Sequence, residues 1–265
     1  MTEETGEKPV SDWPFEQGEW FDIQAHVGVT KHAGSHVATD ELVQLCHIND
    51  RSYVLDVGCG VGLTPCYLAQ RYGCRVLGVD IRESMVERSR EQAQAQGVTD
   101  LTEFRVADAM GLPFEEGTFD VVISESVLAM VADKAKAVSE YLRVVKSGGY
   151  VGLNETAWLR EPEEKYQELM RQSVQGDTLT VEGWASVAEA GGLKDLQVRP
   201  YEISVLRELW RYVRRMGLRN LVETSRRARA LAQENAKYRA FVKRGASVPK
   251  EMANSMGYVI IAGRK

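Results

Sequence analysis

A glycine-rich turn between an apolar strand and the start of a helix constrains this chain more than any other feature of its sequence. Residues 54–64 read VLDVGCGVGLT and place Gly58, Gly60 and Gly62 in a GxGxG spacing. Glycine accepts positive φ angles and lets a ligand approach the backbone closely. Because a tight turn can also need glycine for steric reasons alone, the motif by itself predicts only a strand, a turn and a helix.

Around this turn, short β-branched runs alternate with longer helical stretches between residues 53 and 155. Strands are predicted over residues 53–57, 75–80, 102–106, 119–124 and 150–155. Helices are predicted over residues 63–71, 83–96 and 133–146, ended by Gly73, by Gly97 and by the pair Gly148 and Gly149. Later segments predict helices at 163–174 and from Thr180 to Gly191, strands at 196–203 and 258–262, and helical structure over 205–250. This alternation predicts an α/β fold in which helices cover both faces of a parallel sheet.

The composition is that of an ordinary soluble globular protein. Of 265 residues 44% are hydrophobic, and 33 Lys and Arg accompany 38 Asp and Glu, for a net charge of −5. No stretch reaches the ~18 consecutive apolar residues of a membrane span. The first residues, MTEETGEKPV, are acidic and polar, unlike a secretory leader. We therefore expect a cytoplasmic protein without a transmembrane span.

The cysteines and histidines do not form a recognisable metal site or disulfide framework. Cys46, Cys59, Cys66 and Cys74 include no CxxC pair, and the four histidines lack paired zinc spacing. The prediction is that no metal is bound and that the thiols are small buried residues of a reducing compartment.

Acidic residues lie at or just after the ends of three predicted strands. Asp56 lies near the end of an otherwise apolar strand, where burial without a partner is costly. Asp80 ends the run VLGVD, 18 residues after Gly62, where a carboxylate can accept both hydroxyls of a ribose. Asp108 and Ala109 follow the third strand and could meet a purine edge. Each acid alone could be a helix cap or a solvated strand end, but ligands of open α/β sheets bind along this edge.

At this point the motifs resemble the class I S-adenosylmethionine-dependent methyltransferases, specifically the small-molecule branch that includes the ubiquinone and menaquinone C-methyltransferases. VLDVGCGVG is similar to that family's glycine-rich motif and VLGVDIRESM to its ribose motif. VADAMGLPFEEGTFDVVISESVL is similar to its adenine and fourth-strand motifs, and LRVVKSGGYVGL to its fifth-strand turn. The resemblance covers residues 30–155. It implies a Rossmann-like, seven-stranded, mostly parallel, doubly wound sheet with a helical cap.

The same resemblance implies S-adenosyl-L-methionine as the cofactor. The glycine turn would lie under its methionine and ribose portions, and Asp56 would position the amino acid end. Asp80 would hold the ribose hydroxyls, with Ile81 against the adenine. Asp108 would accept from the adenine amine, and the N–H of Ala109 would donate to the ring. The full set of implied cofactor contacts is Asp56, Gly58, Cys59, Gly60, Asp80, Ile81, Asp108, Ala109, Ser124 and Glu125.

Methyl transfer from a sulfonium mainly requires alignment of the nucleophile, carbon and sulfur. If a proton must leave the acceptor, a nearby His or Glu can take it. Glu125, in SESVL after the fourth strand, is the best-placed carboxylate, although it could also bind the cofactor amine or cap a helix. His32 and His36, four apart in KHAGSHVATDEL, could share a helical face of a segment that often closes over the cofactor in this family. They could also be a surface pair, and His26 is a further candidate base.

Other functions are distinguished by particular positions. In a dinucleotide fingerprint the third glycine would stand where this chain has Leu63, so a nicotinamide dehydrogenase is disfavoured. A nucleobase amine methyltransferase would carry an NPPY-like run at 124–127, where this chain reads SESV. An arsenite methyltransferase needs reactive thiols, and no cysteine follows Cys74. A non-catalytic S-adenosylmethionine-binding protein and a methyltransferase of macromolecules stay open as alternatives.

The predicted domains are an N-terminal lid (1–40), a core (41–204 with 255–265) and a helical cap (205–254). Over residues 205–250, thirteen Lys and Arg accompany three Glu, and one helical face carries Leu206, Leu209, Val213 and Met216. This segment is either a solvated amphipathic helix or a lid whose arginines meet an anionic substrate group, subunit or membrane surface. The expected partner is a small-molecule acceptor, anionic or apolar. A homo-oligomer and peripheral membrane contact are left open, and nucleic acid is disfavoured.

Overall fold

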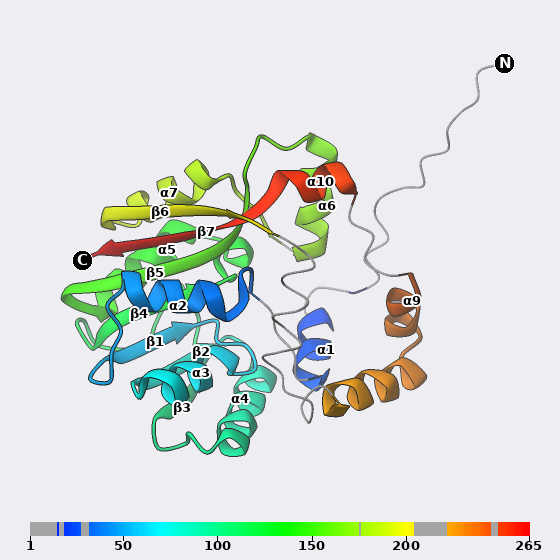
Figure 1. Ribbon diagram of the computed structural model, residues 1–265, viewed down its shortest axis with the longest axis horizontal. Helices are drawn as coiled ribbons and strands as arrows, with labels where there is room; N and C mark the ends of the chain where they lie inside the picture. The colour runs from blue at the N-terminus through cyan, green and yellow to red at the C-terminus, as the bar shows by residue number, and fades with distance from the viewer. Residues whose placement is uncertain (1–14, 16–18, 28–31, 175, 204–221, 245–248) are drawn as a thin grey trace.

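A computed structural model describes residues 15, 19–27, 32–174, 176–203, 222–244 and 249–265 of the chain. Within these ranges, a seven-stranded sheet has the order β3-β2-β1-β4-β5-β7-β6. All neighbouring strands are parallel except β7, which runs antiparallel to β5 and β6. The predicted seven-stranded, mostly parallel sheet is confirmed (Figure 1). The strands are β1 (Tyr53–Val57), β2 (Arg75–Asp80), β3 (Thr102–Val106), β4 (Phe119–Glu125), β5 (Val145–Trp158), β6 (Lys194–Glu202) and β7 (Met256–Arg264).

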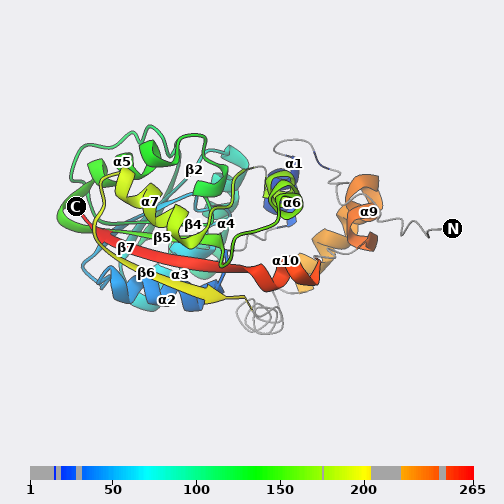
Figure 2. The ribbon, with the colours of Figure 1, turned by 90° about the horizontal axis from the view of Figure 1, so that it is seen from above.

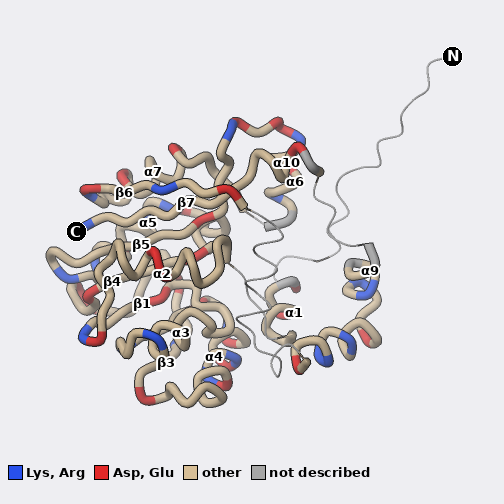
Figure 3. The backbone as a smooth tube through the Cα atoms, viewed as in Figure 1, with Lys and Arg blue, Asp and Glu red and all other residues tan. Residues whose placement is uncertain are grey.

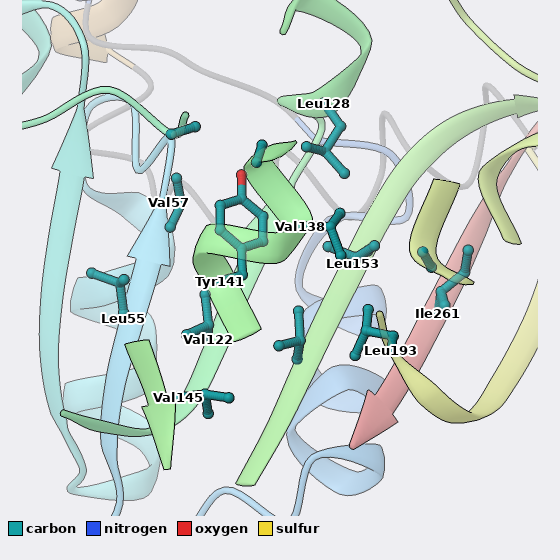
Figure 4. Close-up of a cluster of buried hydrophobic side chains, with 14 of the residues drawn as sticks. Leu55, Val57, Val122, Leu128, Val138, Tyr141, Val145, Leu153, Leu193 and Ile261 are labelled. Atoms are coloured by element: carbon teal, nitrogen blue, oxygen red, sulfur yellow. The ribbon is translucent and has the colours of Figure 1, made fainter. Parts of the chain in front are cut away.

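Helices cover both faces of the sheet, because alternate residues of its strands are buried on opposite sides. Leu55 of β1 belongs to the apolar cluster that includes α5 and α7, whereas Val54 belongs to the cluster that includes α2 and α3. Figure 4 shows the first cluster, with Tyr141 of α5 standing among strand residues such as Val57 and Leu153. The helices are α1 (Glu19–Val27), α2 (Ser35–Leu45), α3 (Leu63–Tyr72), α4 (Glu83–Gln96), η1 (Leu128–Met130), α5 (Lys134–Val144), α6 (Glu164–Val174), α7 (Val181–Ala190), α9 (Ala236–Arg244) and α10 (Lys250–Ser255).

The junction between α5 and β5 differs from the prediction. Gly148 and Gly149 were expected to end the helix, but α5 ends at Val144 and both glycines lie inside β5. A Cβ on Gly149 would lie 2.6 Å from the carbonyl oxygen of Asp120 in β4, and the register of the two strands shifts at this point. The glycine pair therefore permits a close strand contact at an irregularity, which a helix-ending pattern in the sequence does not distinguish.

The helical prediction for residues 205–250 is confirmed over 222–244, which form a helix at 222–234 followed by α9. Leu206, Leu209, Val213 and Met216 lie outside the described residues. Figures 1 and 2 show these helices beside α1, at the edge toward which the parallel strands run. Figure 3 marks Lys and Arg positions in blue along the backbone of these helices. None of the helices in the described ranges has both the length and the apolar character that crossing a bilayer requires.

Helix α1 joins this helical pair to the glycine turn through two different faces. Ile23 and Val27, four residues apart, are buried in a cluster with Tyr238 of α9. Ala25 is instead buried with Val61 of the glycine turn, in a cluster that also includes α4. The N-terminal segment thus lies between the helices at 222–244 and the turn after β1.

Candidate functional site at the carboxyl edge of the sheet

The turn after β1 is held in a left-handed conformation at all three of its glycines. The φ angles are 77° at Gly58, 54° at Gly60 and 79° at Gly62. A Cβ on Gly58 would lie 2.2 Å from Cγ2 of Val127, and one on Gly62 would lie 2.9 Å from Cβ of Ser89. Glycine is therefore required both for the backbone angle and for the close approach of neighbouring segments. The result is a tight turn with its backbone N–H groups near the strand ends.

Asp80, at the end of β2, fixes this turn through backbone hydrogen bonds. Its Oδ2 accepts from the N–H of Gly60 at 3.0 Å, and its Oδ1 accepts from the N–H of Arg82 at 3.0 Å. Burial raises the pKa of Asp80, although these N–H donors act in the opposite direction. Each carboxylate oxygen has a further lone pair, so the group can still accept two hydroxyls. The neighbouring Ile81 is 65% exposed and offers an apolar surface beside it.

Asp56, inside β1, is the most unusual carboxyl group of the edge. The residue is 2% exposed, and its Oδ2 has no hydrogen-bond partner among the described residues. Burial raises its pKa well above the ordinary value, and the nearby carboxylates of Glu125 and Asp80 raise it further. Two buried acids and one partly buried acid, with the Oδ2 of Asp56 unpaired, suit a cationic ligand, because a positive group would relieve both the cost of burial and the repulsion between the acids.

Glu125, the last residue of β4, lies at the centre of a buried hydrogen-bond network. Its Oε2 accepts from Oγ1 of Thr64 on α3 at 2.9 Å. Oγ1 of Thr39 on α2 lies 3.1 Å from Oε1, and Nδ2 of Asn154 on β5 lies 3.3 Å from the same oxygen. Nδ1 of His32 is also 3.3 Å from Oε1. One carboxylate therefore connects the segment before α2, α2 itself, the first turn of α3 and the centre of the sheet.

The histidines predicted as a pair are separated by the structure. Helix α2 begins at Ser35, so His32 precedes it while His36 lies within it. Both ring nitrogens of His32 are near protein groups, because Nε2 is 3.4 Å from Oγ1 of Thr39 and Nδ1 contacts Glu125. The His36 ring lies 6.1 Å from that of Tyr67 instead. The structure thus brings His32 into the Glu125 network.

The remaining predicted cofactor positions lie along the same edge. Asp108 is exposed and accepts from the N–H of Met110 at 2.8 Å, while Ala109 is buried. The Cys59 side chain is buried in an apolar cluster with Phe104, and its N–H donates to the carbonyl of Val79. Its side chain therefore serves packing. Ser124 is fully buried in β4, between β1 and β5.

Several polar residues of the edge were missed by sequence reasoning. Thr39, Thr64 and Asn154 are common residue types, and nothing in their spacing indicates a shared partner. Glu155 did carry a signal, because it is an acid within the apolar run YVGLNETAW. It is 1% exposed in β5 and accepts backbone N–H groups of the segment after β4.

Comparison with known proteins adds to this geometry. Residues 55–153 match the family described as "Methyltransferase domain". Over 187 residues the chain is 31% identical to an uncharacterized protein of Haemophilus influenzae, a match that covers 69% of this chain and 74% of that protein. Over 98 residues it is 40% identical to the chloroplastic tocopherol O-methyltransferase of Arabidopsis thaliana, covering 37% of this chain and only 28% of that enzyme.

A solved structure has a similar fold. It is phosphoethanolamine N-methyltransferase 2 of Haemonchus contortus, in complex with S-adenosyl-L-methionine. The TM-score is 0.71 at 20% sequence identity, and the alignment covers 96% of this chain and 58% of that one. At this identity the likeness concerns the fold.

Proposed function

Since the chain belongs to the class I S-adenosylmethionine-dependent methyltransferases, we propose that it transfers the methyl group of S-adenosyl-L-methionine to a small-molecule acceptor. The observation that carries the proposal is the group formed by the buried Asp56 and Glu125 and the partly buried Asp80 beside the glycine turn. Its unpaired carboxylate oxygen fits the positively charged methionine end of the cofactor. The tocopherol enzyme, whose name states methylation of a small molecule, supports the acceptor class.

Different residues at the carboxyl ends of the strands would contact different parts of the cofactor. Asp56 would pair with the amino acid end, and Asp80 would accept the ribose hydroxyls. Ile81 would pack on the adenine, Asp108 would accept from its amine, and the N–H of Ala109 would donate to its ring. Gly58, Gly60 and the backbone of Cys59 would line the turn, with Ser124 and Glu125 at the end of β4. These assignments rest on the exposed side chain of Ile81 and on the lone pairs of the Asp80 carboxylate that remain free.

When bound, S-adenosyl-L-methionine supplies a methyl group already activated on a sulfonium. The protein then has to hold the acceptor in line and exclude water, and well-held geometry can supply about 7–11 kcal/mol of the barrier. We assign the exclusion of water to the lid (1–40) and the cap (205–254). Helix α1 supports this assignment, because it contacts the glycine turn through Ala25 and α9 through Ile23.

For an acceptor that loses a proton, Glu125 and His32 are the proposed proton acceptors. Both are held by protein contacts, so this role requires one contact of the network to open when the acceptor binds. His36, whose ring lies beside that of Tyr67, stays a predicted base. A quinone-type acceptor, as in the ubiquinone and menaquinone C-methyltransferases, is the finer form of the proposal and rests on the motif resemblance.

Binding and turnover test the proposal separately. Calorimetry should show that S-adenosylhomocysteine binds and that NADH does not. Methyl-labelled cofactor should then be offered with quinols, phenols, secondary amines, bulk RNA and unrelated proteins. Label in a small-molecule arm supports the proposal, whereas label only in RNA or protein contradicts the acceptor class. Binding without label in any arm would favour a non-catalytic cofactor-binding protein.

A further inference from the structure

Glu155 is a buried carboxylate that none of the roles above uses. It is 1% exposed, near the end of β5, and next to Asn154 of the Glu125 network. Its Oε1 accepts from the N–H of Val127 at 3.0 Å and from the N–H of Leu128 at 2.8 Å. A carboxylate that accepts two consecutive N–H groups holds the backbone of that segment in one conformation. Glu155 therefore determines the path of the chain just after β4.

That path is strained. Ser126 has a φ of 60°, in the left-handed region that residues other than glycine rarely adopt. Its N–H donates to the carbonyl of Asn154 at 2.6 Å, so β5 holds the turn from two successive residues. Such strain persists only where the surroundings impose it. The Asn154 carbonyl and the Glu155 carboxylate are the groups that impose it here.

The strained turn at residues 126–128 packs closely against the glycine turn. Cγ2 of Val127 lies 2.2 Å from the point that a Cβ on Gly58 would occupy, so the two turns are in close contact. Leu128 is fully buried in the core, where Figure 4 shows it above Leu153. Glu155 thus holds the backbone of Val127, and the side chain of Val127 in turn contacts Gly58.

We propose that Glu155 is a positioning residue that holds the turn at residues 126–128 against Gly58, and thereby preorganises the S-adenosyl-L-methionine site in the free protein. Without its carboxylate, the turn can relax toward an unstrained φ at Ser126 and Val127 can leave its place on Gly58. The cofactor then has to reorder both turns when it binds, and affinity falls by that cost. The inference rests on cofactor binding and is independent of the acceptor.

The electrostatics of Glu155 agree with this role. Burial raises its pKa to about 7, and the N–H groups of Leu128 and Val127 act in the opposite direction. Lys134 of α5 lowers it as well. The other titratable neighbour on α5 is Tyr141, whose own pKa is raised by burial and, to a lesser extent, by the Glu155 charge.

The test compares Glu155→Ala, Glu155→Gln and the matched control Asp120→Asn. Asp120 also accepts a backbone N–H through its carboxylate, from Tyr53 at 2.8 Å, but at the amino ends of β1 and β4. S-adenosylhomocysteine affinity is measured by calorimetry, and exchange of the amides at 126–130 is measured in the free proteins. We expect Glu155→Ala to weaken binding by at least about tenfold and to speed exchange of the Val127 and Leu128 amides. Glu155→Gln keeps one acceptor oxygen, so its effect should be smaller, and Asp120→Asn should leave both measurements unchanged.

Equal affinity and equal exchange in Glu155→Ala and the natural protein would overturn the inference. If Glu155→Ala does not fold, Val127→Ala decides, because it removes the side chain that contacts Gly58: natural S-adenosylhomocysteine affinity in that variant overturns the inference as well. Equal losses in Asp120→Asn would show a general effect of destabilisation and would also count against it. Failure of the natural protein to bind S-adenosylhomocysteine would instead refute cofactor binding itself.

Discussion

Thr64 donates to Glu125 across 2.9 Å, and this bond joins the first turn of α3 to the end of β4. Both residues are buried, and they are 61 positions apart in the chain. The glycine turn lies directly before Thr64, so the hydroxyl fixes where the turn ends relative to the centre of the sheet. The same carboxylate accepts from Thr39 of α2, so α2 and the first turn of α3 are bonded to one acid.

Replacement of Thr64 by Val should therefore destabilise the protein. The shape is conserved, but the buried Glu125 carboxylate loses a donor, which costs about 1.5–3 kcal/mol for a charged group. Chemical denaturation measures the difference. Thr118→Val is the control, since Thr118 donates to a backbone carbonyl at the exposed surface and should change stability little. Equal effects of the two substitutions would contradict the special role of Thr64.

Asp80→Ala should weaken cofactor binding for two reasons. It removes the acceptor expected for the ribose hydroxyls, and it frees the N–H of Gly60 that shapes the turn. The loss should be about 1.5–3 kcal/mol, or roughly tenfold to a hundredfold in Kd for S-adenosylhomocysteine. Calorimetry provides the value. Asp100→Ala, at an exposed position between α4 and β3, is a control that should bind normally, and an unchanged Kd in Asp80→Ala would refute the ribose assignment.

Gly58→Ala and Gly97→Ala separate backbone strain from the loss of the site. Both glycines have positive φ, 77° and 67°, so both substitutions are strained. A Cβ at Gly58 meets Val127 at 2.2 Å, whereas a Cβ at Gly97 meets nothing within 4 Å. Both variants should lose stability, Gly97→Ala by about 1 kcal/mol. Only Gly58→Ala should lose S-adenosylhomocysteine binding, and retained affinity in that variant would show that the Val127 contact is dispensable.

The pH dependence of stability tests the charge state of Glu155. Its pKa rises from 4.5 to about 7 on folding, so between these values the folded state binds more protons than the unfolded chain. Stability from this group is therefore present at low pH and lost as pH rises through that window. Glu155→Gln has no ionisable group at this position, so it does not lose stability over this pH range. The difference between the Tm of the variant and the Tm of the natural protein should therefore increase between about pH 5 and about pH 8.

This gain should accompany weaker cofactor binding. A merely structural role would move Tm and affinity in the same direction, whereas the proposed positioning role moves them oppositely at about pH 8. Thermal melts monitored by circular dichroism, with calorimetry at the same pH, measure both. A Tm difference that is constant with pH would contradict the raised pKa of Glu155.

The sheet and the strand-end acids were readable from the sequence because each depends on local patterns. The three strands β1, β2 and β3 have the predicted bounds, since their β-branched runs are short and bounded by turns. Asp56 and Asp80 follow directly from those bounds, because parallel strands end at a common edge. The four cysteines are buried thiols, as their small apolar character indicates.

Tertiary structure alone decided how these acids are partnered. The contact of Thr39 with Glu125 spans 86 positions, and a threonine hydroxyl carries no pattern that identifies a distant acceptor. His32 and His36 lie in different elements because α2 starts after Gly34. Gly34 has a φ of 76°, and a Cβ on this residue would lie 2.7 Å from the ring of Tyr258 on β7. The sequence determined which backbone segments form the edge, because secondary structure follows local periodicity. Packing between distant segments decided which side chains meet there, because those contacts exist only once the sheet has assembled.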